Sequence, residues 1–295
     1  PAARGAGPGP VARRGRPRGS ALSHHRRLDW PALAWQAVFL AVPLGLIAGV
    51  SMSTRGPYGG IEWRLSFSAY GRLFDALYIE VFARSLLLAA LNTAVCAVLA
   101  YPLAYWIARA PKRRQGPLVL LVLIPFWTNV LVRLYAWMFI LGRAGPLNAV
   151  LTAAGRTGEP IDFLFTPGAV VLGLVYEHLP FMILPLYATL EKIDWALVDA
   201  AHDLYATPAQ AFWRITLPLS RPGLAAGSVL VFVWTLGDFV TPDILGGSKL
   251  VMAGNVIHQQ YLVMRDWPFG SALSLALMAL VAGCLAVARR REAAA

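Results

Sequence analysis

The stretch Asp199-Ala200-Ala201-His202-Asp203-Leu204-Tyr205, which continues to Pro218, is an amphipathic segment within a very hydrophobic chain. Its apolar residues recur at the three- and four-residue spacing of one helix face; they are Leu197, Ala200, Ala201 and Leu204. A second helix is predicted to begin at Thr207, because Thr207 can cap it, Pro208 suits its first position and Gln210 completes a capping box. The sequence therefore predicts two short helices joined by a tight turn at Tyr205-Ala206.

The second short helix has an apolar side of its own. Phe212, Trp213 and Ile215 form this side, and Pro218 is predicted to end the helix. Long apolar runs flank the segment on both sides, so we expect it to lie between two membrane spans.

The composition of the chain is that of a membrane protein. Of its 295 residues, 58% are hydrophobic and only 14% are charged. Six apolar stretches approach the roughly 20 residues that a helix needs to cross a bilayer; they cover residues 33–53, 84–108, 117–141, 168–190, 222–242 and 271–288. The predicted fold class is an all-α membrane protein with six transmembrane helices. Cys96 and Cys284 both fall in apolar runs and are predicted to be packing residues.

The distribution of positive charge predicts the orientation in the membrane. With the N-terminus in the cytoplasm, the inside segments carry 17 Lys and Arg residues and the outside loops carry 8. Both termini and the segment 195–217 are then cytoplasmic. Residues 1–31 are rich in Arg, Gly and Pro and lack apolar periodicity, so we expect a disordered basic tail that sets topology rather than one that binds nucleic acid.

These spans predict the following organisation. Residues 32–83 hold the first span and an extracytoplasmic loop, in which the apolar residues between Phe67 and Leu77 show the spacing of a short amphipathic helix. Residues 84–288 form a core domain with the other five spans, and residues 289–295 form a cytoplasmic C-terminus.

The amphipathic segment resembles a signature of the permease subunits of type I ATP-driven (ABC) importers. That signature is Glu-Ala-Ala, three residues, Gly, nine residues, and then Ile-x-Leu-Pro. The positions that match its spacing are Asp199, Ala200, Ala201, Tyr205, Ile215, Leu217 and Pro218. Asp199 stands in place of the Glu. Tyr205 stands in place of the Gly, at a turn where a left-handed conformation costs a residue with a side chain about 1 kcal/mol or more.

The resemblance implies that residues 195–217 are a coupling-helix pair that docks into a groove of a separate ATPase subunit. The residues it assigns to this contact are Asp199, Ala200, Ala201, Leu204, Tyr205, Phe212, Ile215, Leu217 and Pro218. It also implies two ATPase copies, a second homologous permease and an extracytoplasmic solute-binding protein at a bacterial plasma (inner) membrane. This chain has no phosphate-binding loop, so ATP and Mg are expected on the ATPase and no cofactor is expected here. An ordinary amphipathic helix at the membrane interface is the alternative.

Polar residues inside the spans mark a candidate substrate pathway, because a charged group at mid-bilayer usually faces a bundle interior or water. They are Asn129, Arg133, Glu177 with its neighbour His178, and Asp238. Two interpretations stay open: Arg133 pairs with Glu177 or Asp238 only to neutralise it, or one of the acids faces the pathway and attracts a cationic solute. Pro125, Pro180 and Pro185 are expected to kink or interrupt their helices.

A second resemblance, to the permeases of spermidine/putrescine importers, covers about residues 33–288. It is carried by residues 125–129, 131–137, 179–188 and 236–242. It adds Trp127 and Tyr135 to the candidate pathway. It implies the first of two different permeases, which moves a polyamine by alternating access.

Other functions are weighed against this hypothesis. The chain has no Ser-His-Asp arrangement and its five His residues lack metal-ligand spacing, so no catalytic or metal site is predicted. A secondary transporter would predict inverted internal repeats, and we find no clear repeat. An importer of the same class that carries another small organic or inorganic solute remains the main alternative.

Overall fold

The computed structural model describes residues 22–155 and 159–293. Within these residues six helical segments are long and apolar enough to cross a membrane. They are Ala34–Ser51, Ala76–Arg109, Val130–Ala153, Pro167–Leu190, Pro208–Gly237 and Trp267–Val287. The predicted fold class, an all-α membrane protein with six spans, is confirmed.

The chain divides into two units, residues 1–47 and residues 48–295. In the first unit the structure describes most of helix α1 (Leu22–Ser51). The sequence places residues 22–31 in a disordered tail, and this prediction is wrong for them because the helix already begins at Leu22. Leu22, Arg26, Arg27 and Leu28, which favour helix, lie in this extension of α1 ahead of its apolar part. The rest of the expected tail, residues 1–21, lies outside the described residues.

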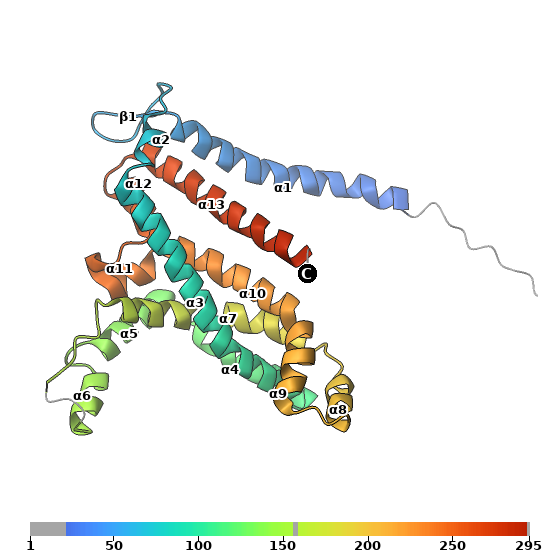
Figure 1. Ribbon diagram of the computed structural model, residues 1–295. Helices are drawn as coiled ribbons and strands as arrows, with labels where there is room; N and C mark the ends of the chain where they lie inside the picture. Colours follow the sequence, from blue (N-terminus) through green and yellow to red (C-terminus); the bar gives the residue numbers. More distant parts are fainter. Residues whose placement is uncertain (1–21, 156–158, 294–295) are drawn as a thin grey trace, which may run out of the picture. The chain divides into compact units, whose positions relative to one another are not determined.

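Three long helices form the centre of the second unit: α3 (Ala76–Arg109), α7 (Pro167–Leu190) and α10 (Leu217–Gly237). Each of them packs against the other two (Figure 1). On α3 the contact side is a row of small residues one helical turn apart, namely Cys96, Ala100, Ala104 and Ala108. Small side chains let helix backbones approach closely in a membrane, where lipid supplies no hydrophobic driving force between helices.

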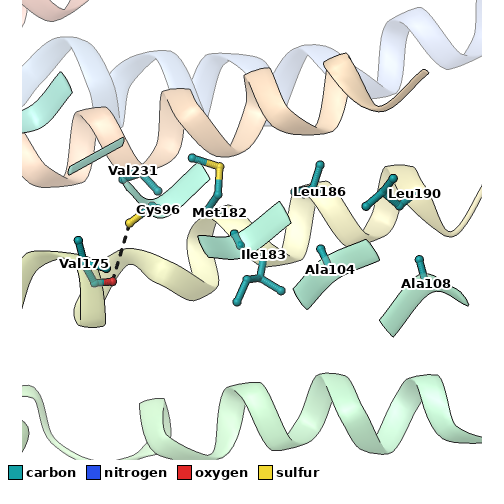
Figure 2. Packing of buried hydrophobic residues seen from close by; sticks show 10 residues of the cluster. Cys96, Ala104, Ala108, Val175, Met182, Ile183, Leu186, Leu190 and Val231 are labelled. Carbon is teal, nitrogen blue, oxygen red and sulfur yellow. Dashed lines mark hydrogen bonds between the residues drawn. The ribbon is translucent and has the colours of Figure 1, made fainter. Parts of the chain in front are cut away.

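Larger side chains of α7 fill the space that the small residues of α3 leave. Figure 2 shows Met182, Ile183, Leu186 and Leu190 of α7 packed with Val231 of α10. The Cys96 thiol is fully buried and donates to the carbonyl oxygen of Val175 at 3.8 Å. Cys96 and Cys284 are both free, as the sequence predicts.

The third predicted span is not one continuous helix. Residues 117–141 fall instead on α4 (Lys112–Leu123), a 3-10 turn η1 (Ile124–Trp127) and α5 (Val130–Leu141). Pro125 lacks an N–H, and the chain leaves helical geometry at Thr128-Asn129 before α5 begins. The expected interruption at Pro125 is thus observed. A short helix α6 (Pro146–Ala153) follows α5 in the loop 143–167.

The other prolines lie inside helices that continue past them. Pro180 and Pro185 both lie inside α7 and do not interrupt it. Pro218 does not end the second amphipathic helix: α9 (Pro208–Ala211) runs through a π turn, η2 (Phe212–Thr216), directly into α10. Pro218 follows this π turn directly, where the regular α-helical hydrogen-bond pattern is already interrupted, and the helix continues through it.

The end of the core that carries the start of α3 is held by several short elements. A hairpin of β1 (Thr54–Arg55) and β2 (Ile61–Glu62) precedes α2 (Ser68–Arg72), which is shorter than the helix expected between Phe67 and Leu77 because α3 already begins at Ala76. Beyond α10 follow α11 (Val240–Gly246), the 3-10 turn η3 (Gly247–Lys249), α12 (Ala253–Leu262) and α13 (Trp267–Ala293). Arg72 pairs with the buried Asp266 at 2.7 Å and ties α2 to the start of α13.

We predict that Gly223→Ala destabilises the fold. A Cβ at Gly223 would lie 2.7 Å from the carbonyl oxygen of Pro185, so α7 and α10 would have to move apart. The expected loss is about 1–3 kcal/mol, seen as a lower unfolding midpoint in detergent. Gly283→Ala is the matched control, because a Cβ at Gly283 of α13 meets nothing within 4 Å. An equal or higher midpoint for Gly223→Ala would contradict the close packing of α7 and α10.

Candidate functional site

A cavity of about 660 Å³ opens beside the three central helices. Its walls come from η1, α5, α7, α10 and the start of α11. The residues that line it are Phe126, Val130, Arg133, Glu177, His178, Phe181, Val233, Trp234, Gly237, Asp238, Phe239 and Val240. Three of the predicted pathway residues, Arg133, Glu177 and Asp238, therefore meet at one place although they come from three different spans.

Two helix breaks shape this cavity. The first separates η1 from α5, and the side chain of Asn129 caps α5 by accepting from the backbone N–H of Leu131 at 2.8 Å. The second separates α10 from α11 at Asp238-Phe239. Non-helical backbone at membrane depth is tolerated where it lines a cavity inside the protein, which is the case at both breaks.

Arg133 and Glu177 form an ion pair at the cavity. Nη2 of Arg133 donates to Oε2 of Glu177 at 2.7 Å, and the two side chains are only 11% and 8% exposed. Nη1 of Arg133 also donates to the carbonyl oxygen of Pro125 at 3.3 Å, and the guanidinium carbon lies 4.8 Å from the centre of the Phe126 ring. Of the two partners that the sequence leaves open for Arg133, the structure shows Glu177.

Asp238 is held by groups at the start of the following helix, α11, instead of by a basic side chain. Its Oδ1 accepts from the backbone N–H groups of Val240 at 2.9 Å and Thr241 at 3.1 Å, and its Oδ2 accepts from the Thr241 hydroxyl at 2.6 Å. In the described part of the chain no Lys or Arg pairs with Asp238. Because Arg133 pairs with Glu177, Asp238 is the acid of this cavity that has no basic partner in the described part of the chain.

His178 belongs to a buried polar cluster behind the cavity wall. It is 4% exposed, and the side-chain nitrogen of Asn92 on α3 lies 3.3 Å from its Nδ1. The same nitrogen donates to Thr235 of α10 at 2.7 Å. An amide nitrogen only donates, so Nδ1 of His178 is the acceptor in this contact. The cluster joins α3, α7 and α10 at the level of the cavity.

Aromatic rings form much of the remaining wall, and they are not among the pathway residues predicted from the sequence. Phe181 and Trp234 stack with ring centres 5.5 Å apart, and Phe126 stacks on Tyr176 at 5.9 Å. Phe181 and Trp234 each lie one helical turn from a predicted acid, Glu177 and Asp238. This i, i+4 spacing is the signal that could have found them.

Other predicted pathway residues do not line the cavity. Trp127 is 79% exposed and Tyr135 is 54% exposed, and neither contributes to the wall. Asn129 caps α5, as described above. The resemblance added Trp127 and Tyr135 by motif position, which does not determine which side of a broken helix a residue occupies.

The amphipathic segment forms α8 (Ala196–Asp203) and α9, joined by the predicted turn. Thr207 and Gln210 form the predicted capping box around Pro208. Tyr205 adopts the left-handed conformation, with φ of 63°. Its N–H still donates to the carbonyl oxygen of His202 at 2.9 Å, which closes the turn.

The tip of this segment has no cover from the described part of the chain. Leu204 is 81% exposed and Tyr205 is 96% exposed, and Asp199 and Ala200 are exposed as well. Phe212, by contrast, packs edge-on against Tyr101 of α3, with ring centres 5.2 Å apart. The segment therefore presents an apolar tip on the outside while Phe212 fixes its base.

A second set of contacts fixes the start of α8. Trp195 packs edge-on against Tyr105 of α3 at 5.6 Å, and the guanidinium carbon of Arg109 lies 5.0 Å from the centre of the Trp195 ring. Lys112 donates to Glu191 at 3.1 Å and holds the pKa of that exposed carboxyl below its usual value. The start of the segment is thus attached to α3 through Trp195, and the Lys112–Glu191 pair joins α4 to the end of α7 just before the segment.

The sequence of this chain matches a known protein family. The family described as "Binding-protein-dependent transport system inner membrane component" matches residues 100–289. The chain is 42% identical over 245 residues to the spermidine/putrescine transport system permease protein PotB of Escherichia coli, which covers 83% of this chain and 89% of that protein. It is 41% identical over 249 residues to the protein of the same name from Haemophilus influenzae, with 84% and 87% covered.

A solved structure shares the fold. A chain of a bacterial alginate ABC transporter, crystallised in complex with an alginate-bound periplasmic protein, superposes with a TM-score of 0.69 at 18% sequence identity, and the match covers 90% of this chain and 95% of that one. The family match, the identity to permease subunits and the six-span fold agree. The chain belongs to the family of inner membrane components of binding-protein-dependent transport systems.

Proposed function

We propose that this chain is a permease subunit that forms half of the translocation pathway of an ATP-driven polyamine importer. It would span the bacterial inner membrane with both termini in the cytoplasm. Its partners would be a second homologous permease, two ATPase subunits that hold ATP and Mg, and an extracytoplasmic solute-binding protein. The spans would alternate between inward-open and outward-open conformations as the ATPase binds and hydrolyses ATP.

The charge of the cavity carries the choice of a cationic cargo. Asp238 has no Lys or Arg partner among the described residues, and Arg133 is occupied by Glu177. Aromatic faces of Phe126, Phe181 and Trp234 line the same space, and such faces attract an ammonium group. The named permeases at 41–42% identity are spermidine/putrescine permeases, which supports the same class of cargo.

The exposed tip of the α8–α9 segment supports the contact with an ATPase. Leu204 and Tyr205 are large apolar residues with almost no cover in the chain, while the base of the segment is firmly packed. A surface of this kind suits a groove in a partner better than it suits water. Within the segment, Asp199, Ala200, Leu204 and Tyr205 are placed to make the contact, and Phe212 is placed to position it.

The first test concerns the pathway acid. Asp238→Asn removes the charge but keeps the shape, because the Asn oxygen can accept from Val240 and Thr241 and the Thr241 hydroxyl can rotate to accept from the Asn nitrogen. We expect uptake of radiolabelled putrescine to fall about tenfold or more in cells that express the whole importer, since hydrogen bonds to a charged group contribute about 1.5–3 kcal/mol. Asp162→Asn, at a 73% exposed acid in the loop before α7, is the control.

Two outcomes would count against this function. Normal uptake by Asp238→Asn would remove the pathway role of Asp238. Absence of polyamine uptake by the unmodified importer, together with uptake of a different solute, would replace the cargo and leave the importer class in place.

The second test concerns the coupling segment. Leu204→Glu places a charge on the exposed tip, and Asp199→Ala removes the acid of the motif. Both variants should insert and fold normally, but the amount of ATPase subunit that co-purifies should fall about fivefold or more, as expected when an interface anchor worth 1–3 kcal/mol is lost. Leu262→Glu is the control. Leu262 is exposed too, at 67%, but it is the last residue of α12, near the opposite end of α3. Undiminished ATPase in both variants would rule out this segment as the docking element.

A further inference from the structure

The ion pair between Arg133 and Glu177 leaves two buried atoms without partners. Nε of Arg133 and Oε1 of Glu177 make no hydrogen bond to any described residue, although both atoms are inaccessible. The pair is joined by one short N–O contact instead of the two parallel ones that an arginine and a carboxylate can make. Unsatisfied charged groups in a buried site are costly, so this geometry is not one optimised for stability.

The chain contains an ion pair that shows what a structural pair looks like. Asp266, which is almost fully buried, accepts from Arg72 through Oδ2 and from the backbone N–H of Phe269 through Oδ1. The guanidinium of Arg72 lies 3.8 Å from the centre of the Phe269 ring. Both carboxylate oxygens of Asp266 are therefore satisfied. The cavity that Arg133 and Glu177 line does not include Arg72 or Asp266.

The guanidinium of Arg133 has contacts that do not depend on Glu177. Nη1 donates to the carbonyl oxygen of Pro125, and the group also faces the ring of Phe126. Both partners belong to η1, just before the break that precedes α5. Arg133 could therefore release Glu177 and keep these two contacts at η1, where a carbonyl oxygen and an aromatic face both favour a cation.

We propose that Arg133 is a displaceable counter-ion that occupies Glu177 in the empty cavity and gives way to an amino group of the cargo. The inference rests on the proposed function and deepens it. In the empty cavity Asp238 has no Lys or Arg partner among the described residues. When a cargo amine replaces Arg133 at Glu177, the carboxylates of Glu177 and Asp238 can each pair with one amino group, so the site selects solutes with at least two amino groups over those with one.

The exchange also explains why a basic residue lines a pathway for cations. A permanently unpaired Glu177 would bear a buried charge whenever the cavity is empty, which costs free energy. A fixed, fully bonded pair would leave no acid for a second amine. A loosely bonded pair avoids both costs, because one cation leaves the carboxylate as another arrives.

Three variants test this order of events: Arg133→Gln, Glu177→Gln and the double variant. Each is expressed with the complete importer, and putrescine uptake is normalised to the amount of chain in the membrane. Loss of Glu177 alone should be the most harmful change, with uptake reduced about tenfold or more, because it leaves the Arg133 charge to repel the cargo. Uptake by the double variant should be at least about threefold higher than uptake by Glu177→Gln. Uptake by Arg133→Gln should stay within about threefold of that by the unmodified importer.

The same design tests a purely structural pair. A structural pair predicts that the two single variants lose uptake and thermal stability to the same extent and that the double variant restores both. That pattern would overturn the inference, as would Arg133→Gln transporting no better than Glu177→Gln. Arg72→Gln and Asp266→Asn provide the reference for structural behaviour, and both are expected to lower the unfolding midpoint. If the unmodified importer takes up no polyamine, the proposed function itself is wrong and this inference falls with it.

Discussion

Hydrocarbon offers no hydrogen-bond partners, so the backbone polar groups that this chain places within its spans must be satisfied by the chain itself. Two helix breaks, at Thr128-Asn129 and at Asp238-Phe239, concentrate that requirement around one cavity. Each break carries its own cap: Asn129 accepts from α5, and Asp238 accepts from α11. The cavity can therefore exist between the helices without exposing unpaired backbone groups to lipid.

The tightly packed helices α3, α7 and α10 connect this cavity with the α8–α9 segment. Near the cavity, Asn92 of α3 contacts Thr235 of α10 and His178 of α7. Further along α3, Tyr101 and Tyr105 contact Phe212 and Trp195 at the base of the segment. One helix thus touches both places, and close packing at Gly223 limits independent movement of α7 and α10. Under the proposed alternating access, a displacement of the segment by an ATPase would reach the cavity through these contacts.

Much of this arrangement is predictable from the sequence. Hydropathy gives the number of spans and the approximate position of every span except the third, and the capping residues Thr207, Pro208 and Gln210 give the start of α9. The spacing from Asp199 to Pro218 indicates the family, which the comparisons confirm. The left-handed conformation expected at the Gly position of the motif is also present, although Tyr205 occupies it.

The remaining features depend on three-dimensional contacts that a pattern does not encode. Sequence spacing allows Arg133 to pair with either Glu177 or Asp238, and only packing of α5 against α7 selects Glu177. Trp127 and Tyr135 belong to the same motif as Arg133, yet both lie outside the cavity. Trp127 precedes the break before α5, and Tyr135 is two residues from Arg133 and so lies on another face of α5. A π turn carries α9 directly into α10, so the helix continues through Pro218 instead of ending there.

The most direct measurement of the central claim is ATP hydrolysis by the reconstituted importer in liposomes, with its solute-binding protein outside. If this chain is the permease of a polyamine importer, hydrolysis rises when the binding protein is loaded with spermidine or putrescine, and the polyamine accumulates in the compartment that the binding protein does not face. Hydrolysis that ignores the loaded binding protein, or that proceeds without accumulation of polyamine, would contradict it.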